Sequence, residues 1–209
     1  MLPLGVILAG GRATRMGGGD KGLLRLGDAT LLDRVIARLA PQVSGLALSA
    51  NGDPARFADT GLPVVADSIE GFPGPLAGVL AGLDWASGQG ASAIVTVAAD
   101  TPFFPTDLVA RLTATADGMT HPLVLAATPR GTEKTKSMSR SGLIRHPTFG
   151  LWPVTLRDDL RAALNEGINK VVIWTEKHGG REAVFPTGSG DPFFNVNTPE
   201  DLATAEALL

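Results

Sequence analysis

The chain has 209 residues, 44% of them hydrophobic and 19% charged, and this globular composition excludes a protein that is disordered throughout. Its 18 Lys and Arg residues and 21 Asp and Glu residues give a net charge of −3, which excludes the basic excess that bulk nucleic-acid binding requires. Cys is absent, which excludes disulfides, thiolate zinc sites and Cys nucleophiles.

In the first half of the chain, short apolar runs alternate with segments whose apolar residues have the spacing of a helix. Strands are predicted at 4–8, 45–50, 62–66 and 93–98, and helices at 31–39, 76–87 and 106–113. The run at 93–98 is uninterrupted, which is typical of a central parallel strand that is covered on both faces. The alternation predicts an α/β fold with an open, mostly parallel sheet. Such sheets bind ligands at the carboxyl ends of their strands, so the loops after Leu8, Ala50, Ala66 and Ala99 should face one crevice.

The second half is less regular. Strands are predicted at 122–128 and 170–175, a helix at 155–165, and a polar loop at 129–145. The last helix opens at Thr198-Pro199-Glu200-Asp201. Thr198 is expected to cap it, Pro199 suits its first position, and the acids favour the positive end of the helix dipole.

We expect a cytoplasmic protein without a membrane segment. The apolar N-terminal stretch, residues 1–11, is short and lacks both a basic leader and a small-residue cleavage site. The longest uncharged interior run, residues 85–99, is interrupted by Gly88-Gln89-Gly90 and is too short to span a bilayer.

A glycine-rich stretch over residues 8–21 follows the first strand. Its glycines let backbone amides approach an anion closely, and Arg15 and Lys21 add positive charge. The stretch therefore predicts a cradle for a polyphosphate, with a flexible turn carrying solvated cations as the alternative. It is no P-loop, because Lys21 lies between Asp20 and Gly22, and it lacks the glycine spacing of a dinucleotide fingerprint.

Polar residues follow three of the predicted strands. Asp100 comes after the most apolar strand, and a carboxylate there suits Mg²⁺, which is bound by one or two carboxylates together with substrate phosphates. Asp67 and Asn51 follow two other strands and could contact a base or a ribose. The alternative for all three is a turn residue that bonds its local backbone.

Six short sequence motifs, spread in order along nearly the whole chain, carry a resemblance to a known family. They are Leu8 to Leu24, Asp67-Ser68, Pro73 to Gly78, Asp100 to Phe103, His146 to Trp152, and Asn195 to Asp201. Together they resemble the molybdenum cofactor guanylyltransferases. The glycine-rich stretch alone marks the wider nucleotidyltransferase superfamily, and the later blocks narrow it to the molybdopterin branch.

The resemblance implies a fold and a reaction. The fold would be a single-domain, three-layer, Rossmann-like nucleotidyltransferase fold similar to GT-A, with a nucleotide-binding half at 1–120 and an acceptor-binding half at 121–209. The enzyme would transfer GMP from GTP to the terminal phosphate of Mo-molybdopterin and release pyrophosphate. We expect a monomer that also contacts other molybdenum cofactor biosynthesis proteins or the enzymes that receive the product.

The resemblance also implies site residues. GTP would contact Leu8, Ala9, Gly10, Gly11, Lys21, Asn51, Asp67, Pro75, Leu76, Ala77 and Asp100. Catalysis would rest on Arg15, Lys21 and Asp100, with Mg²⁺ as the cofactor on Asp100, because charge must be offset when one phosphate attacks another. Asn195 and Asn197 would bind the acceptor. His146 is expected to form a hydrogen bond within the fold rather than to hold a metal.

Two questions stay open at the level of sequence. The predicted loop at 129–145 carries Arg130, Lys134, Lys136, Arg140 and Arg145, and it is either a solvated surface loop or a basic flap that guides the acceptor phosphate or contacts a partner protein. The rivals to the main function are a CTP-dependent cytidylyltransferase, a sugar-phosphate nucleotidyltransferase and a nucleotide-binding module without turnover.

Overall fold

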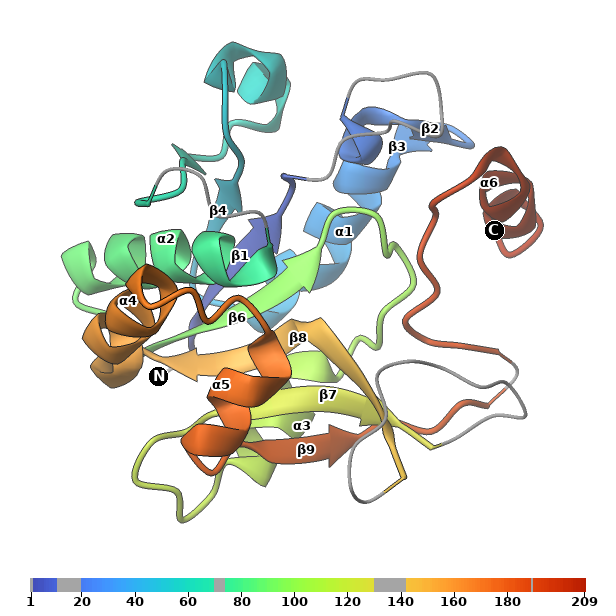
Figure 1. The fold of residues 1–209 in the computed structure, drawn as a ribbon. Helices are drawn as coiled ribbons and strands as arrows, with labels where there is room; N and C mark the ends of the chain where they lie inside the picture. Colours follow the sequence, from blue (N-terminus) through green and yellow to red (C-terminus); the bar gives the residue numbers. More distant parts are fainter. Residues whose placement is uncertain (1, 11–19, 70–73, 130–141, 189) are drawn as a thin grey trace.

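A computed structural model gives the fold of the chain, drawn in Figure 1. The structure describes residues 2–10, 20–69, 74–129, 142–188 and 190–209. Gly11, Arg15 and the basic residues 130–140 of the predicted loop lie outside these ranges. Within them, no helix combines the length and the apolar character that crossing a bilayer demands.

Seven strands form one open sheet in the order β5-β4-β1-β6-β8-β7-β9. They are β1 (Leu4–Leu8), β4 (Leu46–Ser49), β5 (Val64–Val65), β6 (Ala93–Ala98), β7 (Val124–Thr128), β8 (Ile144–Pro153) and β9 (Arg181–Val184). Neighbouring strands are parallel except around β8, which runs antiparallel to both β6 and β7. The predicted α/β fold with a mostly parallel sheet is therefore confirmed.

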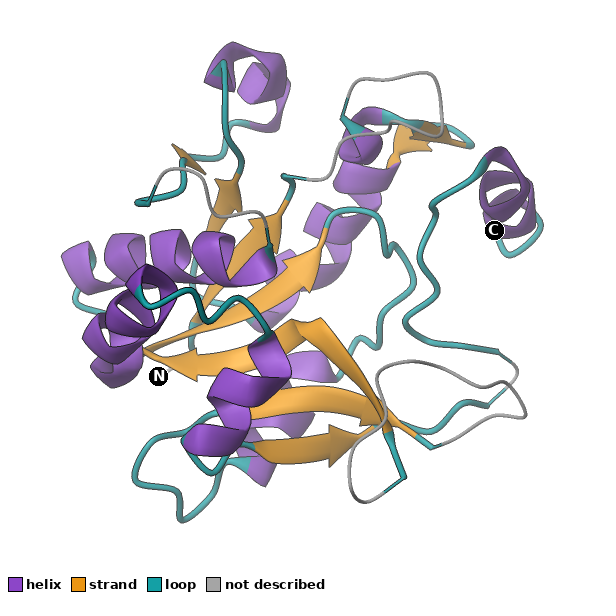
Figure 2. Cartoon of the chain, viewed as in Figure 1, coloured by secondary structure: helices purple, strands orange, loops and turns teal. Residues whose placement is uncertain are grey.

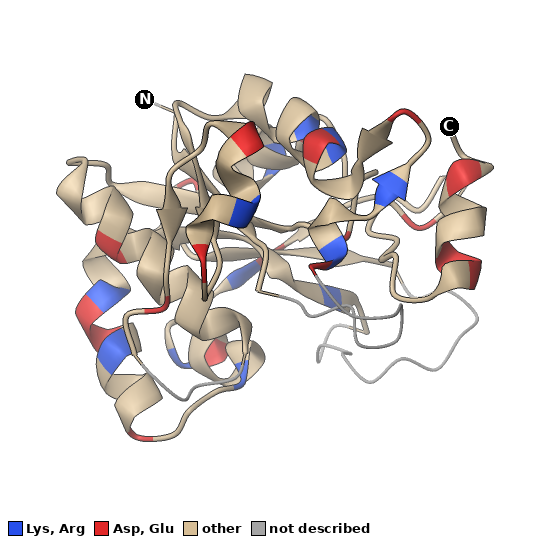
Figure 3. Cartoon of the chain, turned by 90° about the horizontal axis from the view of Figure 1, so that it is seen from above, with Lys and Arg blue, Asp and Glu red and all other residues tan. Residues whose placement is uncertain are grey.

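Helices cover both faces of this sheet, giving three layers (Figures 1 and 2). One face carries α1 (Leu31–Leu39) and α3 (Leu108–Thr115), and the other carries α2 (Pro75–Gly88), α4 (Arg157–Asn165) and α5 (Val171–Lys177). A small second sheet pairs β2 (Arg25–Leu26) with β3 (Ala29–Thr30), and α6 (Pro199–Glu206) packs beside it. Basic and acidic residues are interspersed over the described parts of the chain (Figure 3).

Strand β6 explains why the most apolar run of the sequence lies at the centre. Val95 and Val97 pack in the core that contains α1 and α3. Ile94 packs in the opposite core, with α2 and α4. Successive side chains of a strand point to opposite faces, so a strand that is covered on both sides needs apolar residues throughout.

The segment 170–175 contradicts its prediction as a strand, because it forms helix α5. Val171 and Trp174 are buried while Ile173 is 53% exposed, which is the spacing of a helix with one buried face. The Trp174 ring stacks against Trp152 with centroids 6.3 Å apart. Packing of this tryptophan outweighs the strand preference of the β-branched residues around it.

Strands β8 and β9 have no counterpart among the predicted elements. Because β8 begins at Ile144, the end of the loop predicted at 129–145 is strand. Arg145 pairs with Glu182 at 2.5 Å and with Glu176 at 2.9 Å, which ties it to β9 and α5. Arg145 is therefore committed to structural ion pairs and does not belong to a free basic flap.

Candidate active site

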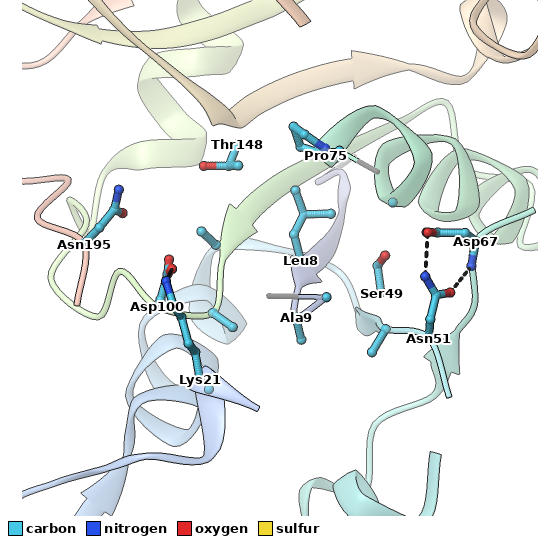
Figure 4. Close-up of a pocket in the computed structure, with 17 residues that line it drawn as sticks. Leu8, Ala9, Lys21, Ser49, Asn51, Asp67, Pro75, Asp100, Thr148 and Asn195 are labelled. Atoms are coloured by element: carbon cyan, nitrogen blue, oxygen red, sulfur yellow. Dashed lines mark hydrogen bonds and ion pairs between the residues drawn. The ribbon is translucent and has the colours of Figure 1, made fainter. Parts of the chain in front are cut away.

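A cavity of about 430 Å³ lies at the carboxyl ends of β1, β4 and β6. The loops after these strands and after β5 contribute Gly10, Asn51, Asp100 and Asp67 to its lining. The four loops meet because β5, β4, β1 and β6 are parallel neighbours in the sheet. The first turn of α2, β8 and the segment before α6 complete the walls (Figure 4).

Lys21 supplies positive charge at one end of the cavity. Its Nζ lies 3.3 Å from Asp100 Oδ2 and also donates a hydrogen bond to Asn197 Oδ1. Gly22 makes this placement possible, because a Cβ there would lie only 3.2 Å from the Cβ of Ala99 at the end of β6. The lysine side chain is 18% exposed, so its charge is only partly screened by solvent.

The segment before α6 is fastened to the end of β6. The amide of Val196 donates to the carbonyl oxygen of Asp100 at 2.9 Å. The hydroxyl of Thr101 donates to Asn195 Oδ1 and lies 3.3 Å from Asp100 Oδ1. Residues close to the C-terminus are thereby held at the same strand end as the carboxylate predicted to bind the metal.

Asn51 and Asp67 form a reciprocal pair at the other end of the cavity (Figure 4). Asn51 Nδ2 donates to Asp67 Oδ2 at 2.6 Å, and the amide of Asp67 donates to Asn51 Oδ1 at 2.9 Å. Arg56 donates to the carbonyl oxygen of Asn51 at 2.5 Å. The two side chains thus have fixed orientations, and the Asp67 carboxylate contributes negative charge to this end of the cavity.

The first turn of α2 closes the wall between these two ends. Gly74 has φ 146°, a conformation that favours glycine, and Pro75 occupies the first helical position. No side chain caps the helix. A Cβ on Gly78 would lie 2.7 Å from Ser49 Oγ and 2.9 Å from Leu8, so glycine lets α2 pack tightly against β4 and β1.

The structure brings most of the predicted site residues to this one cavity. The lining includes Leu8, Ala9, Gly10, Lys21, Asn51, Asp67, Pro75, Asp100 and Asn195. Leu76 and Ala77 are 1% and 2% exposed and do not line it. Asn197 is not a lining residue either, and Gly11 and Arg15 lie outside the described residues.

Two polar residues of the lining were missed by the sequence analysis, namely Ser49 and Thr148. Ser49 ends β4 two residues before Asn51, so its position at a strand end was the available signal. Thr148 belongs to β8, which was not predicted as a strand, and the available signal was the family block from His146 to Trp152 that contains it.

His146 lies beyond the cavity and forms a hydrogen bond within the fold, as expected. Its Nε2 lies 3.0 Å from Thr128 Oγ1, and its ring stacks on Phe193 at 4.2 Å. Burial lowers the pKa of His146 to about 4, and the nearby Asp191 carboxylate opposes that shift only in part. Among the described residues, no group of three or more His, Asp or Glu side chains could hold a metal ion by itself.

The chain matches known nucleotidyltransferases in sequence and in fold. The family model of the MobA-like NTP transferase domain matches residues 5–179. A protein of Mesorhizobium japonicum named molybdenum cofactor guanylyltransferase is 50% identical, covering 98% of this chain and 95% of its own. A protein of the same name from Cereibacter sphaeroides is 48% identical, covering 98% and 96%.

Solved structures support the same fold. Molybdopterin-guanine dinucleotide biosynthesis protein A from Archaeoglobus fulgidus superposes with a TM-score of 0.71 at 19% identity, covering 98% of this chain and 97% of its own. Because the family model spans most of the chain and close relatives span nearly all of it, the nucleotidyltransferase prediction is confirmed. The chain belongs to the MobA-like nucleotidyltransferases, within the molybdenum cofactor guanylyltransferase family.

Proposed function

We propose that this enzyme transfers GMP from GTP to the terminal phosphate of Mo-molybdopterin, giving the guanine dinucleotide form of the cofactor and pyrophosphate. The observation that carries the proposal is the Lys21–Asp100 pair, which faces a cavity formed by strand ends and the open backbone at Gly10. Family membership supplies the guanylyl donor and the pterin acceptor.

The Lys21 end of the cavity suits the triphosphate. Among the described residues, no atom would lie within 4 Å of a Cβ added at Gly10, so that part of the chain leaves room for an anion to approach the backbone there. Two phosphate charges about 4 Å apart repel by about 4 kcal/mol at an effective dielectric of 20. Lys21 would offset this repulsion and the charge on departing pyrophosphate, and Arg15 is proposed to assist it.

The donor set of the cavity fits Mg²⁺. Asp100 presents one carboxylate to the lining and is 23% exposed, and Mg²⁺ binds through one or two carboxylates completed by phosphates and water. Asp100 would hold the ion. When bound, Mg²⁺ would neutralise negative charge on the reacting phosphates.

The remaining walls divide between the nucleotide and the acceptor. Asn51, Asp67 and Pro75 would contact the nucleoside, because their end of the cavity carries an acid and no cation among the described lining residues. Thr148 and Asn195 would face the acceptor. In this division the first group lies before residue 120 and the second after it, as in the proposed nucleotide-binding and acceptor-binding halves.

No general base is required by this reaction. The attacking phosphate is already ionised near neutral pH, so the protein contributes position and charge rather than proton transfer. Lys21 holds and neutralises phosphate oxygens, and Asn197 would keep its ammonium group in place. The segment before α6 would bring the acceptor to the same strand end, because it is bonded to Asp100.

The test is pyrophosphate release with Mg²⁺, molybdopterin and each nucleoside triphosphate in turn. The proposal predicts release that needs both GTP and molybdopterin. Release with CTP alone would assign cytidylyl transfer, and release with a sugar phosphate as acceptor would assign that substrate class instead. Nucleotide binding without release under all conditions would contradict an enzymatic role.

A further inference from the structure

Arg56 lies in the loop between β4 and β5, and its guanidinium contacts three groups in two separate segments. Its Nε lies 2.6 Å from Asp20 Oδ2, and Nη2 donates to the carbonyl oxygen of Asn51 at 2.5 Å. Nη1 donates to the carbonyl oxygen of Asp53 at 3.2 Å. Nε is buried and has no aligned hydrogen-bond partner among the described residues, so its contact with Asp20 is a charge pair. One side chain therefore joins the residue before Lys21 to the residues that follow β4.

The residues around Arg56 hold its guanidinium in place. Gly52 has φ 87°, and a Cβ there would lie 2.8 Å from Arg56 Nη1, so glycine lets the loop fold closely around the guanidinium. The guanidinium carbon lies 4.8 Å from the ring centroid of Phe57, which is buried. Arg56 is not a lining residue of the cavity. The arrangement therefore fits a side chain that positions other residues rather than one that contacts a ligand.

The two segments that this guanidinium joins lie at opposite ends of the cavity. Asp20 belongs to the same short turn as Lys21, because the Leu23 amide donates to the Asp20 carbonyl oxygen at 3.1 Å. Asn51 forms the reciprocal pair with Asp67 at the other end (Figure 4). A nucleoside triphosphate in the proposed orientation spans both ends, so its affinity depends on how the two ends are placed relative to one another.

The charge of Asp20 gives a second reason for the bridge. Its carboxylate is 19% exposed and belongs to the residue next to Lys21, where phosphates are proposed to bind. An uncompensated carboxylate there would repel phosphate oxygens, and solvent screens that repulsion only in part at this exposure. The guanidinium of Arg56 compensates this charge.

We propose that Arg56 is a positioning residue for the nucleotide, an inference that rests on the proposed function. Its guanidinium holds the Asp20–Lys21 turn and the backbone of Asn51 in a fixed relation, so that the phosphate and nucleoside ends of the cavity are preorganised for one GTP molecule. A preorganised site loses less conformational freedom on binding, so the bridge strengthens GTP binding although Arg56 does not touch GTP.

The experiment measures the Kd for GTP by calorimetry with Mg²⁺ and without acceptor. Arg56→Met removes the bridge and should raise the Kd about tenfold. Arg56→Lys keeps the charge, but one ammonium group cannot hold Asp20 and both carbonyl oxygens in the same geometry, so its Kd should lie between those of wild type and Arg56→Met. In both variants the acceptor KM at saturating GTP should stay within about twofold of wild type, because the segment before α6 is bonded to Asp100 and not to this bridge.

A double-mutant cycle tests whether Arg56 acts through Asp20. In an Asp20→Asn background the bridge is already broken, so adding Arg56→Met should raise the Kd less than about threefold. Arg34→Met is the matched control, because Arg34 also pairs with a carboxylate, that of Asp28, and donates to a backbone carbonyl, that of Leu26, without lining the cavity. It should leave the Kd for GTP unchanged, although it loses the same kinds of contact.

An unchanged Kd for GTP in Arg56→Met would overturn the inference, and so would wild-type affinity in Arg56→Lys. An equal penalty for Arg56→Met with and without Asp20→Asn, or an equal rise of the Kd in Arg34→Met, would overturn it as well. Failure of the proposed function has a different signature. In that case, wild type would release no pyrophosphate from GTP and molybdopterin, or would bind another nucleotide more tightly than GTP. Loss of the Arg56 effect with normal guanylyl transfer removes the inference alone.

Discussion

Lys21 stands between two oxygen acceptors at the end of the cavity where phosphates are proposed to bind. It is bonded to Asp100, 79 residues away, and to Asn197, 176 residues away. The ammonium group is therefore positioned before any ligand arrives, and less reorganisation is needed when charge develops on phosphate oxygens.

Replacing Lys21 tests that electrostatic role. Lys21→Met keeps a long side chain but removes the charge, so we expect kcat to fall about 10²-fold and GTP binding to weaken. Pyrophosphate release under steady-state conditions measures both effects. Lys177→Met is the matched control, because Lys177 is 57% exposed and pairs with Asp159 away from the cavity. Near-normal turnover in Lys21→Met would remove the lysine from catalysis.

Asn197 has two competing roles that kinetics can separate. The structure bonds it to Lys21, whereas the sequence resemblance implies contact with the acceptor. If it positions Lys21, Asn197→Ala should lower kcat about tenfold with little change in the acceptor KM. A large rise in the acceptor KM with unchanged kcat would instead support direct acceptor contact.

Where strand ends carried the information, the position of a residue in the fold was predictable from the sequence, although its role in the site stays a prediction. Asp67 and Asp100 follow apolar runs, and parallel strands bring such positions to one edge. The bond from Asn197 to Lys21 was not predictable in this way, because it joins segments far apart in sequence through the tether to β6.

At the scale of elements, the packing of α2 depends on Gly78, although alanine has the higher helix propensity. Gly78→Ala should normally favour a helix by about 1 kcal/mol. Here the new Cβ would clash with Ser49 and Leu8, and overpacking costs about 1–3 kcal/mol. We therefore expect a net fall in the free energy of unfolding, measured by urea titration, and weaker GTP binding.

Gly88 provides the comparison on the same helix. It is the last residue of α2, and no atom of the described residues would lie within 4 Å of an added Cβ. Gly88→Ala should therefore leave GTP binding unchanged and raise the free energy of unfolding by up to about 1 kcal/mol. Equal effects of the two substitutions would contradict tight packing of α2 on β4 and β1.

Local signals identified most elements, and long-range packing decided the others. Thr198 caps α6 as predicted, accepting from the Asp201 amide in a capping box, because that signal lies within four residues. Helix α5 was mistaken for a strand because burial of Trp174 determines its conformation. Strands β8 and β9 owe their pairing to β7 and β6, which a single-segment pattern does not reveal.

At the scale of the whole molecule, His146 joins β8 to β7 and to the segment before α6. It contacts Thr128 and Phe193 in a buried setting that lowers its pKa to about 4 from 6.5. The folded state therefore binds this proton less readily than the unfolded state. Its contribution to stability is complete above pH 6.5 and is lost as the pH falls toward 4.

Unfolding titrations at pH 7 and pH 4.5 measure this dependence. Protonation of His146 should cost up to about 3 kcal/mol, from a shift of about 2.5 units at 1.36 kcal/mol per unit. His146→Gln should show a smaller loss of stability between the two pH values than wild type. Proton NMR of the wild-type imidazole should show no titration above pH 6. An identical pH dependence in both proteins would contradict the buried neutral histidine.

The position of the bound nucleotide tests the proposed site and mechanism most directly. A crystal structure of the enzyme with Mg²⁺ and a non-hydrolysable GTP analogue gives it directly. We expect the triphosphate between Gly10 and Lys21, the metal on Asp100, and the nucleoside at the end of the cavity formed by Asn51 and Asp67. A triphosphate bound away from Lys21 and Asp100 would contradict the proposed site and the chemistry built on it.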